Sequence, residues 1–223
     1  MQEALAHVLG IGGPPDSGKT TVATIIAERH GLQEYHFDRH EMAHFGRLDP
    51  ERHPALHAAH PDRMTTEQRW LGSSPEEMTH DIIACWSERF AMALDDLLTM
   101  PQTPGIVAEG PGLFPELVAP LIDSPQRAIW LLPSEPFKRA SVAGRGKPGN
   151  RHETSDPERA THNLTERDLL MTAHIRRTAA EHSLRIIEVD GKEGVEAIAE
   201  RVDAHFGLPR ISCHHHESST LGR

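Results

Sequence analysis

A ten-residue segment near the start of the chain has residue types and spacing that suit phosphate binding. Residues 12–21 read GGPPDSGKTT and match the pattern G-x-x-x-x-G-K-[ST], with Gly13, Gly18, Lys19 and Thr20 in register. Glycine lets backbone N–H groups approach an anion closely, because no Cβ blocks the way. Lys19 is expected to reach the β- and γ-phosphates of ATP, and the Thr20 hydroxyl to hold Mg²⁺. The remaining loop residues predicted to contact the nucleotide are Asp16, Ser17 and Thr21.

The sequence around this loop predicts a strand before it and a helix after it. Residues 7–12 form a short apolar run typical of a buried parallel strand, and Val22, Ile25 and Ile26 give one face of a helix. The N-terminal end of such a helix points its positive end at the same anion. This order of strand, loop and helix favours a phosphate site over a glycine-rich turn that binds nothing.

Further apolar runs predict a parallel sheet. Four more strands are expected at residues 34–38, 105–110, 127–132 and 184–189, each separated from the next by a helical pattern. Five strands that alternate with helices imply an α/β sandwich of three layers, with a five-stranded parallel sheet covered by helices on both faces. Ligands gather at the carboxyl ends of such strands. The phosphate loop, Asp38 after the second strand and Glu109 in the third are therefore expected on one rim.

A basic, glycine-rich stretch follows the fourth strand. It has five basic residues between Lys138 and Arg151 and no acidic one, which predicts a mobile lid over residues 144–155. A plain surface loop is the alternative. An anion-binding loop, two carboxylates and a basic lid on one rim describe phosphoryl transfer.

The rest of the chain is expected to form one domain over residues 1–208. Residues 39–75 lack a clear apolar period and read as an insertion on the acceptor side, and the tail from residue 209 is expected to be disordered or loosely packed. The formal net charge of −10 argues against nucleic acid or an anionic membrane as the main partner. No apolar run is long enough to span a bilayer and the first residues lack a basic signal-peptide start, so we expect a cytoplasmic protein.

A competing metal motif lies directly after the second strand. His40 to His44 reads HEMAH, the H-E-x-x-H pattern of zinc proteases. The extended form of that pattern fails, because Arg47 and Pro50 stand where it requires Gly and His. We keep a zinc hydrolase as a third hypothesis. The histidines between residues 49 and 74 are interpreted as a solvated face or acceptor-site lining rather than a metal site.

The loop and its context resemble the P-loop small-molecule kinases, the group that contains nucleoside monophosphate kinases, shikimate and gluconate kinases and chloramphenicol phosphotransferase. The resemblance covers most of residues 6–206, and its specific motif is residues 13–20. It implies ATP- and Mg²⁺-dependent phosphoryl transfer to a hydroxyl of a small molecule such as a nucleoside, a sugar-like metabolite or an antibiotic. In that group a carboxylate just after strand two contacts the acceptor hydroxyl or acts as base, and Asp38 matches that position.

The resemblance also implies roles for residues outside the loop. Arg145 and Arg151 resemble the lid arginines of the group, and Arg167 resembles a phosphate-contacting arginine. Glu109 resembles the acidic residue at a strand end that, in this group, contacts Mg²⁺ through water or contacts the acceptor. Gly191 lies in the turn that, in such kinases, often runs past the adenine base.

The sequence does not identify the phosphate acceptor, because the usual acceptor signatures of adenylate, guanylate and shikimate kinases are missing between residues 39 and 75. Asp38 favours a hydroxyl acceptor, whereas Arg39, Arg47 and Arg69 keep a nucleotide acceptor open. The alternative from another class is a nucleotide-binding regulatory NTPase or switch that acts through a protein partner. The sequence leaves the preference for ATP over GTP and the oligomeric state undecided.

Overall fold

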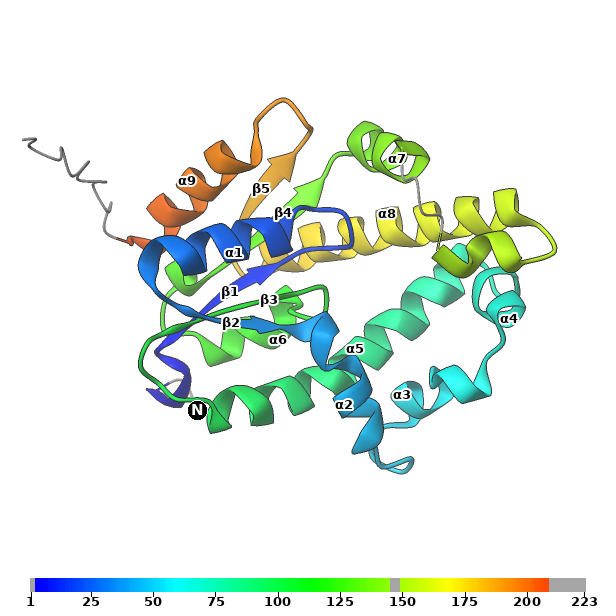
Figure 1. The fold of residues 1–223 in the computed structure, drawn as a ribbon, viewed down its shortest axis with the longest axis horizontal. Helices are drawn as coiled ribbons and strands as arrows, with labels where there is room; N and C mark the ends of the chain where they lie inside the picture. Colours follow the sequence, from blue (N-terminus) through cyan, green and yellow to red (C-terminus); the bar gives the residue numbers. More distant parts are fainter. Residues whose placement is uncertain (1–2, 145–148, 209–223) are drawn as a thin grey trace, which may run out of the picture.

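A five-stranded parallel sheet forms the centre of the molecule. The computed structural model describes residues 3–144 and 149–208. Within them the strand order is β2-β3-β1-β4-β5 (Figure 1). The strands are β1 Val8–Gly12, β2 Gln33–His36, β3 Ile106–Gly110, β4 Ala128–Pro133 and β5 Arg185–Val189. Every pair of neighbouring strands is parallel, which confirms the predicted fold class.

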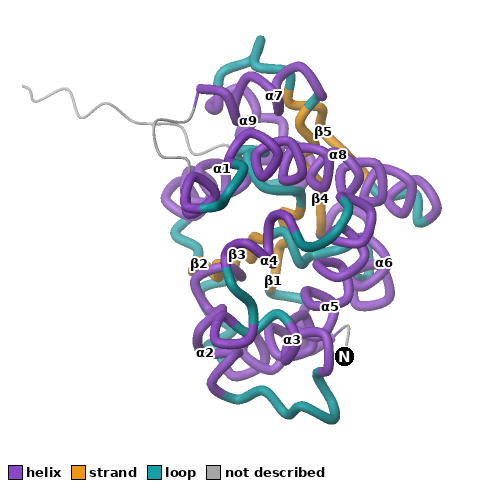
Figure 2. The backbone as a smooth tube through the Cα atoms, turned by 90° about the vertical axis from the view of Figure 1, so that its right-hand side faces the viewer, coloured by secondary structure: helices purple, strands orange, loops and turns teal. Residues whose placement is uncertain are grey.

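Helices cover both faces of this sheet. α1 and α9 lie on one face, and α5, α6 and α8 lie on the other (Figures 1 and 2). The helices are α1 Lys19–His30, α2 Glu41–Gly46, α3 Pro54–Ala58, α4 Thr66–Leu71, α5 Pro75–Thr99, α6 Pro115–Val118, α7 Glu135–Gly144, α8 Pro157–Glu181 and α9 Val195–Phe206.

Side chains that alternate along the strands pack into two hydrophobic cores, one on each face of the sheet. Ile129 and Leu131 of β4 pack in the core under α1 and α9, whereas Trp130 and Leu132 pack in the core against α5 and α8. All four side chains are fully buried. Burial of each such side chain contributes roughly 1.5–3 kcal/mol, so the position of the central strands is strongly fixed. The loops that follow the strands are thereby held at one rim.

The two longest helices begin at side chains that cap their first turns. Ser74 and Glu77 form a reciprocal cap at the start of α5, with distances of 3.2 and 2.8 Å between backbone N–H and side-chain oxygen. Asp156 caps α8 by accepting from the Arg159 amide at 3.0 Å. Such caps contribute about 1 kcal/mol each. α5 and α8, each 25 residues long, pack against one another and carry side chains toward the rim.

Three details differ from the expectations. β2 ends at His36, and Asp38 lies in the 3₁₀ turn Phe37–His40 rather than at the end of the strand. The helix expected over residues 115–122 is α only to Val118, because Pro120 has no N–H to continue the ladder. Residues 39–75 contain short helices that pack through buried side chains such as Phe45 and Leu56.

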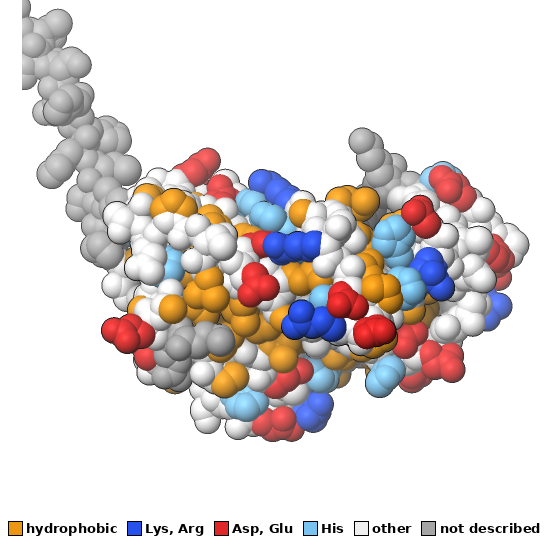
Figure 3. All heavy atoms as spheres, turned by 90° about the horizontal axis from the view of Figure 1, so that it is seen from below, with side chains coloured by type: hydrophobic (Ala, Val, Ile, Leu, Met, Phe, Trp, Pro, Cys, Tyr) orange, Lys and Arg blue, Asp and Glu red, His pale blue; other side chains and the backbone are white. Residues whose placement is uncertain are grey.

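On the face seen from below, acidic, basic and histidine side chains are mixed around hydrophobic patches (Figure 3). No helix within the described ranges combines the length and apolar character that crossing a membrane requires. The predicted tail, residues 209–223, and Arg145 of the predicted lid lie outside the described residues.

Candidate nucleotide site

The loop between β1 and α1 contains two glycines with a positive φ, and at one of them there is no room for a side chain. Gly13 has φ +142°, and a Cβ there would lie 2.2 Å from the Leu131 carbonyl oxygen. Gly18 has φ +80° and caps the start of α1. Asp16 also has a positive φ, of 69°, which costs free energy for a residue with a side chain. The sequence motif therefore folds into a tight turn that carries the chain from β1 to α1.

The first turn of α1 presents donors that the helix itself does not use. The first helical hydrogen bond runs from the Val22 amide to the Gly18 carbonyl at 3.1 Å. The amides of Lys19, Thr20 and Thr21 therefore have no partner within the helix, as at every helix N-terminus. Next to them the Ser17 hydroxyl is buried and has no hydrogen-bond partner in the described part of the chain. This set of donors suits an anion.

These groups line an open pocket of about 330 Å³. Its lining is Pro15, Asp16, Gly18, Lys19, Thr20, Thr21 and Asp38. The Lys19 side chain is 5% exposed, and its Nζ lies 3.4 Å from the Pro14 carbonyl oxygen. Burial lowers the pKa of the Lys19 ammonium, while Glu109 and Asp38 act to raise it. A positive charge with little water around it binds an incoming polyphosphate more strongly than an exposed one does.

Thr20, which lines this pocket, contacts the buried Glu109. The Thr20 hydroxyl donates to Glu109 Oε1 at 3.1 Å, and His36 Nδ1 lies 2.9 Å from the same oxygen. Glu109 is 2% exposed, and its Oε2 is buried without a hydrogen-bond partner among the described residues. Mg²⁺ prefers carboxylate, hydroxyl and water oxygens, so this pair of residues fits the predicted site. His36, which the sequence did not single out, faces Glu109 in the register of β2 and β3.

Asp38 reaches the pocket from the turn after β2. Its side chain is exposed at the pocket mouth, yet the surrounding protein atoms remove enough hydration to raise the pKa of its carboxyl group. Lys19 acts to lower that pKa and Glu109 to raise it. A carboxylate with a raised pKa beside an anion-binding loop is suited to accept a proton.

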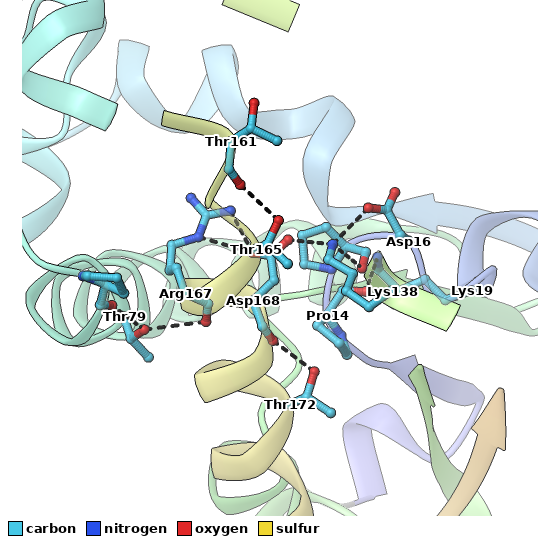
Figure 4. A network of polar contacts seen from close by, with 12 residues as sticks. Pro14, Asp16, Lys19, Thr79, Lys138, Thr161, Thr165, Arg167, Asp168 and Thr172 are labelled. Carbon is cyan, nitrogen blue, oxygen red and sulfur yellow. Dashed lines mark hydrogen bonds and ion pairs between the residues drawn. The ribbon is translucent and has the colours of Figure 1, made fainter. Parts of the chain in front are cut away.

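Lys138, the first residue of the basic stretch, is buried and contacts the phosphate loop. Lys138 of α7 is fully buried, and its Nζ contacts Asp16 Oδ2 at 2.7 Å and Asp168 Oδ2 at 2.5 Å (Figure 4). It also donates to the Pro15 carbonyl at 3.3 Å. Burial lowers the pKa of Lys138, and Asp168 opposes that effect. Lys138 and Asp168 had no sequence motif of their own, so only the packing of α7 and α8 reveals them.

Arg167 and Arg151 meet around one aromatic ring. Arg167 donates through Nε and Nη2 to Asp168 Oδ1, at 3.0 and 2.7 Å (Figure 4). The Arg167 and Arg151 guanidinium groups lie 5.5 and 5.7 Å from the centroid of the Trp70 ring. The two predicted arginines therefore lie together, and Arg167 connects through Asp168 and Lys138 to the phosphate loop.

Gly191 lies in the turn after β5. Its φ is +81°, and a Cβ would lie 2.8 Å from the Phe137 ring of α7. The same turn is closed by the Lys192 amide, which donates to Asp190 Oδ1 at 3.0 Å. Glycine is required there by packing, and contact with an adenine base stays a prediction.

The H-E-x-x-H motif does not form a zinc site. His44 uses both ring nitrogens, because Nε2 contacts Asp96 Oδ2 at 2.9 Å and Nδ1 lies 3.3 Å from Arg89 Nε. His40 stacks on Tyr35, and its Nδ1 contacts the His36 carbonyl. Within residues 3–144 and 149–208 no group of three or more His, Cys, Asp or Glu side chains is arranged to hold a metal ion. The third hypothesis from the sequence is wrong for this physical reason.

Comparisons with known proteins give structural likeness only. No protein-family model matches the sequence, and no curated protein does. A shikimate kinase from Bacteroides thetaiotaomicron is 13% identical, with 90% of this chain and 98% of that chain covered and a TM-score of 0.44. An uncharacterized protein from Eubacterium ventriosum is 13% identical, with 90% and 97% covered and a TM-score of 0.42. Similarity at this level identifies neither a substrate nor a reaction.

Proposed function

We propose that this protein is an ATP- and Mg²⁺-dependent phosphotransferase that transfers the γ-phosphate to a hydroxyl of a small molecule. The observation that carries the proposal is one pocket in which Lys19, the first-turn amides of α1 and Asp38 converge. A loop that binds a polyphosphate beside a carboxylate with a raised pKa has the two parts that hydroxyl phosphorylation needs.

The residues divide the reaction between them. The loop amides and Lys19 bind the β- and γ-phosphates, while Thr20 and Glu109 hold Mg²⁺, with Glu109 acting through water. Mg²⁺ supplies positive charge that offsets the charge of the phosphates. Asp38 orients the acceptor hydroxyl and takes its proton as the oxygen attacks the γ-phosphorus and the bond to the β-phosphate oxygen breaks.

Basic residues complete the proposed site from the lid side. Arg145, Arg151 and Arg167 offset charge on the transferring phosphoryl group when the lid, residues 144–155, closes. Residues 39–75 bind the acceptor, and the turn at Gly191 lies against the adenine base. These assignments follow the resemblance to P-loop small-molecule kinases and are part of the proposal.

The test is acceptor-dependent ADP release from Mg·ATP by the wild type, Lys19→Ala and Asp38→Asn. Both variants are expected to lose turnover, Asp38→Asn by about 10²–10⁴-fold if it removes a general base. Arg177→Ala is a control, because Arg177 is exposed and pairs with Glu181 on the far end of α8. Full turnover in both site variants contradicts the proposal. Slow, Lys19-dependent hydrolysis that no acceptor stimulates favours the regulatory NTPase instead.

A further inference from the structure

A closed ring of polar side chains joins α1 to the strands β2 and β3. The Thr20 hydroxyl donates to Glu109 Oε1 at 3.1 Å, and His36 Nδ1 contacts the same oxygen at 2.9 Å. His36 Nε2 lies 3.0 Å from Glu34 Oε2, and the Thr24 hydroxyl donates to that oxygen at 2.7 Å. Thr20 and Thr24 are one turn apart on α1, so the chain of contacts returns to the helix from which it starts.

The alternation of side chains along the strands produces this ring. Glu34 and His36 alternate with Tyr35 in β2, so their side chains leave the same face of the sheet. His36 pairs with Glu109 in the register of β2 and β3, which puts the Glu109 side chain on that face as well. α1 packs on this face through its apolar residues. The ring is therefore fixed by the fold and does not depend on one flexible side chain.

His36 lies between the two carboxylates of the ring. Its side chain is 6% exposed, compared with 3% for Glu109 and 29% for Glu34. Carboxylate oxygens only accept hydrogen bonds, so this position suits an imidazolium, which donates through both nitrogens. Burial lowers the pKa of Lys19 and Glu109 acts to raise it, so Lys19 interacts with the same carboxylate. In the proposed function Lys19 also binds the phosphates, whereas His36 serves the carboxylates alone.

The two oxygens of Glu109 have different surroundings. Oε1 accepts from Thr20 and contacts His36, whereas Oε2 is buried and has no hydrogen-bond partner in the described part of the chain. A buried carboxylate oxygen without a partner is rare and indicates a missing water or ion. The Thr20 hydroxyl uses its proton for Oε1, so the lone pairs of its oxygen can face a cation. The contacts to Oε1 thus leave Oε2 available to water bound to Mg²⁺.

We propose that His36 is a positioning residue for Mg²⁺, which holds Glu109, and through Glu109 the Thr20 hydroxyl, in the arrangement that the metal–nucleotide complex needs. The proposal rests on the phosphotransferase function proposed above. In this role His36 contacts neither the nucleotide nor the acceptor. It precedes Asp38 by two residues, so it also connects the metal side of the site to the turn that carries the proposed base.

The experiment separates the metal-dependent part of nucleotide binding from the rest. The Kd of a non-hydrolysable ATP analogue is measured by calorimetry in excess Mg²⁺ and in EDTA, and the ratio of the two constants gives the affinity gained through the metal. His36→Leu is expected to reduce this gain by about tenfold or more, because Glu109 loses the partner that orients it. The Kd in EDTA should stay unchanged, whereas a general structural role would weaken binding in both conditions equally.

Two milder variants apply the same test if His36→Leu does not fold. His36→Gln keeps a donor and should lose less of the metal-dependent gain than His36→Leu. Glu34→Gln keeps an acceptor for Thr24 and leaves the contact between His36 and Glu109 in place, so its loss should be smaller still. His80→Leu is the matched control, because His80 is exposed on α5.

A double variant tests whether His36 acts through Glu109. Glu109→Gln alone should reduce the metal-dependent gain, and His36→Gln should add little in that background, since two residues that act as one unit are not additive. Fully additive losses would show that His36 acts elsewhere and would overturn the proposal. An unchanged gain in the His36 variants, or an equal fall of affinity in EDTA, overturns it as well.

Failure of this proposal differs from failure of the proposed function. If Mg²⁺ increases the affinity of the wild type for the analogue and the His36 variants gain as much, only the role of His36 is overturned. If the wild type binds the analogue no better in Mg²⁺ than in EDTA, or does not bind it, the Mg²⁺-dependent phosphotransferase function is overturned together with the role of His36.

Discussion

Asp16 places a negative charge inside a loop that is proposed to bind a polyphosphate. Its carboxylate is turned to Lys138, which neutralises it and also contacts Asp168. Without that lysine the carboxylate would lose a buried cation that offsets its charge, and it would repel the nucleotide more strongly. Lys138 is therefore a positioning residue, since it acts on the loop rather than on the reacting atoms.

Lys138→Met is expected to weaken binding of an ATP analogue by about tenfold or more and to lower the free energy of unfolding by about 3–5 kcal/mol. The cause is the loss of a cation that contacts two buried carboxylates, Asp16 and Asp168. Fluorescence titration and urea unfolding measure the two effects. Arg139→Met is the matched control. Arg139 is exposed, and within the described structure it pairs only with Glu135 and Glu166.

A double variant separates charge from packing. Asp16→Asn combined with Lys138→Met also removes the negative charge from the loop, so nucleotide affinity should recover part of the loss seen in Lys138→Met alone. Equal affinity in wild type and Lys138→Met would show that Lys138 has no influence on the loop.

Asp38 determines how the proposed reaction depends on pH. Desolvation raises the pKa of Asp38 above its ordinary value of 3.8, so its basic form is lost at a higher pH than for an exposed aspartate. The rate should therefore be full on the alkaline side and should fall on acidification through that raised pKa. The pH profile of kcat/KM tests this, and Asp38→Asn should remove the acid limb along with most of the rate. An acid limb that is unchanged in Asp38→Asn assigns the titration to another group.

At the scale of elements, a polar cluster fixes α2 to α5. Asp96 accepts from Tyr35, His44 and Arg47, at 2.9, 2.9 and 2.5 Å. His44 in turn contacts Arg89, which donates to the Phe37 carbonyl. The cluster therefore supports the turn that carries Asp38.

This cluster should make stability depend on pH. Burial lowers the pKa of His44 below its ordinary value of 6.5, and Arg89 adds to this effect, whereas Asp96 opposes it. The unfolded chain then binds a proton near pH 6.5 that the folded chain does not, so the stability contributed by His44 is full above that pH and falls as the pH drops below it. Urea unfolding at pH 7.5 and 5.5 measures the loss.

The variant His44→Gln removes this titration and its hydrogen bonds. It should lower the free energy of unfolding by about 1–3 kcal/mol at pH 7.5, and its stability should change less between the two pH values. His80→Gln is the control, because His80 is exposed on α5. An identical pH response in wild type and His44→Gln contradicts this account.

The elements show what sequence patterns can and cannot predict. The glycine-rich loop, the apolar strands and the helix caps depend on local chemistry, so their positions were predictable. The role of Lys138 was not, since a lysine in a basic stretch predicts solvent exposure and only the meeting of α7, α8 and the loop buries it. The H-E-x-x-H pattern was misleading because the burial of His44 depends on contacts with Asp96 and Arg89, which are distant in sequence.

At the scale of the whole molecule, residues 149–155 contact α4. Glu67 of α4 accepts from the Ser155 amide at 3.0 Å, and Trp70 donates to Asn150 Oδ1 at 2.9 Å. Trp70 also lies against Arg151 and Arg167. α4, the 3₁₀ turn Gly149–Glu153 and α8 thus meet at one indole ring.

This arrangement predicts that α4 and the turn Gly149–Glu153 respond together to a nucleotide. An ATP analogue in the nucleotide pocket acts on Asp16 and, through Lys138, Asp168 and Arg167, on Trp70. Hydrogen exchange of the two segments should therefore slow together when the analogue binds to the wild type. In Trp70→Ala, which removes the shared ring and its hydrogen bond to Asn150, the analogue should still slow exchange in the phosphate loop.

The same variant should lose at least part of the response in α4, because the ring that joins α4 to Arg151 and Arg167 is gone. Trp70→Phe is the matched comparison, since it keeps a smaller aromatic ring for the two arginines and removes the indole N–H that binds Asn150. It should keep more of the joint response than Trp70→Ala does. If both variants match the wild type in all three segments, the nucleotide site and the acceptor side do not communicate through Trp70, and a direct action of the nucleotide on each segment explains the slowing better.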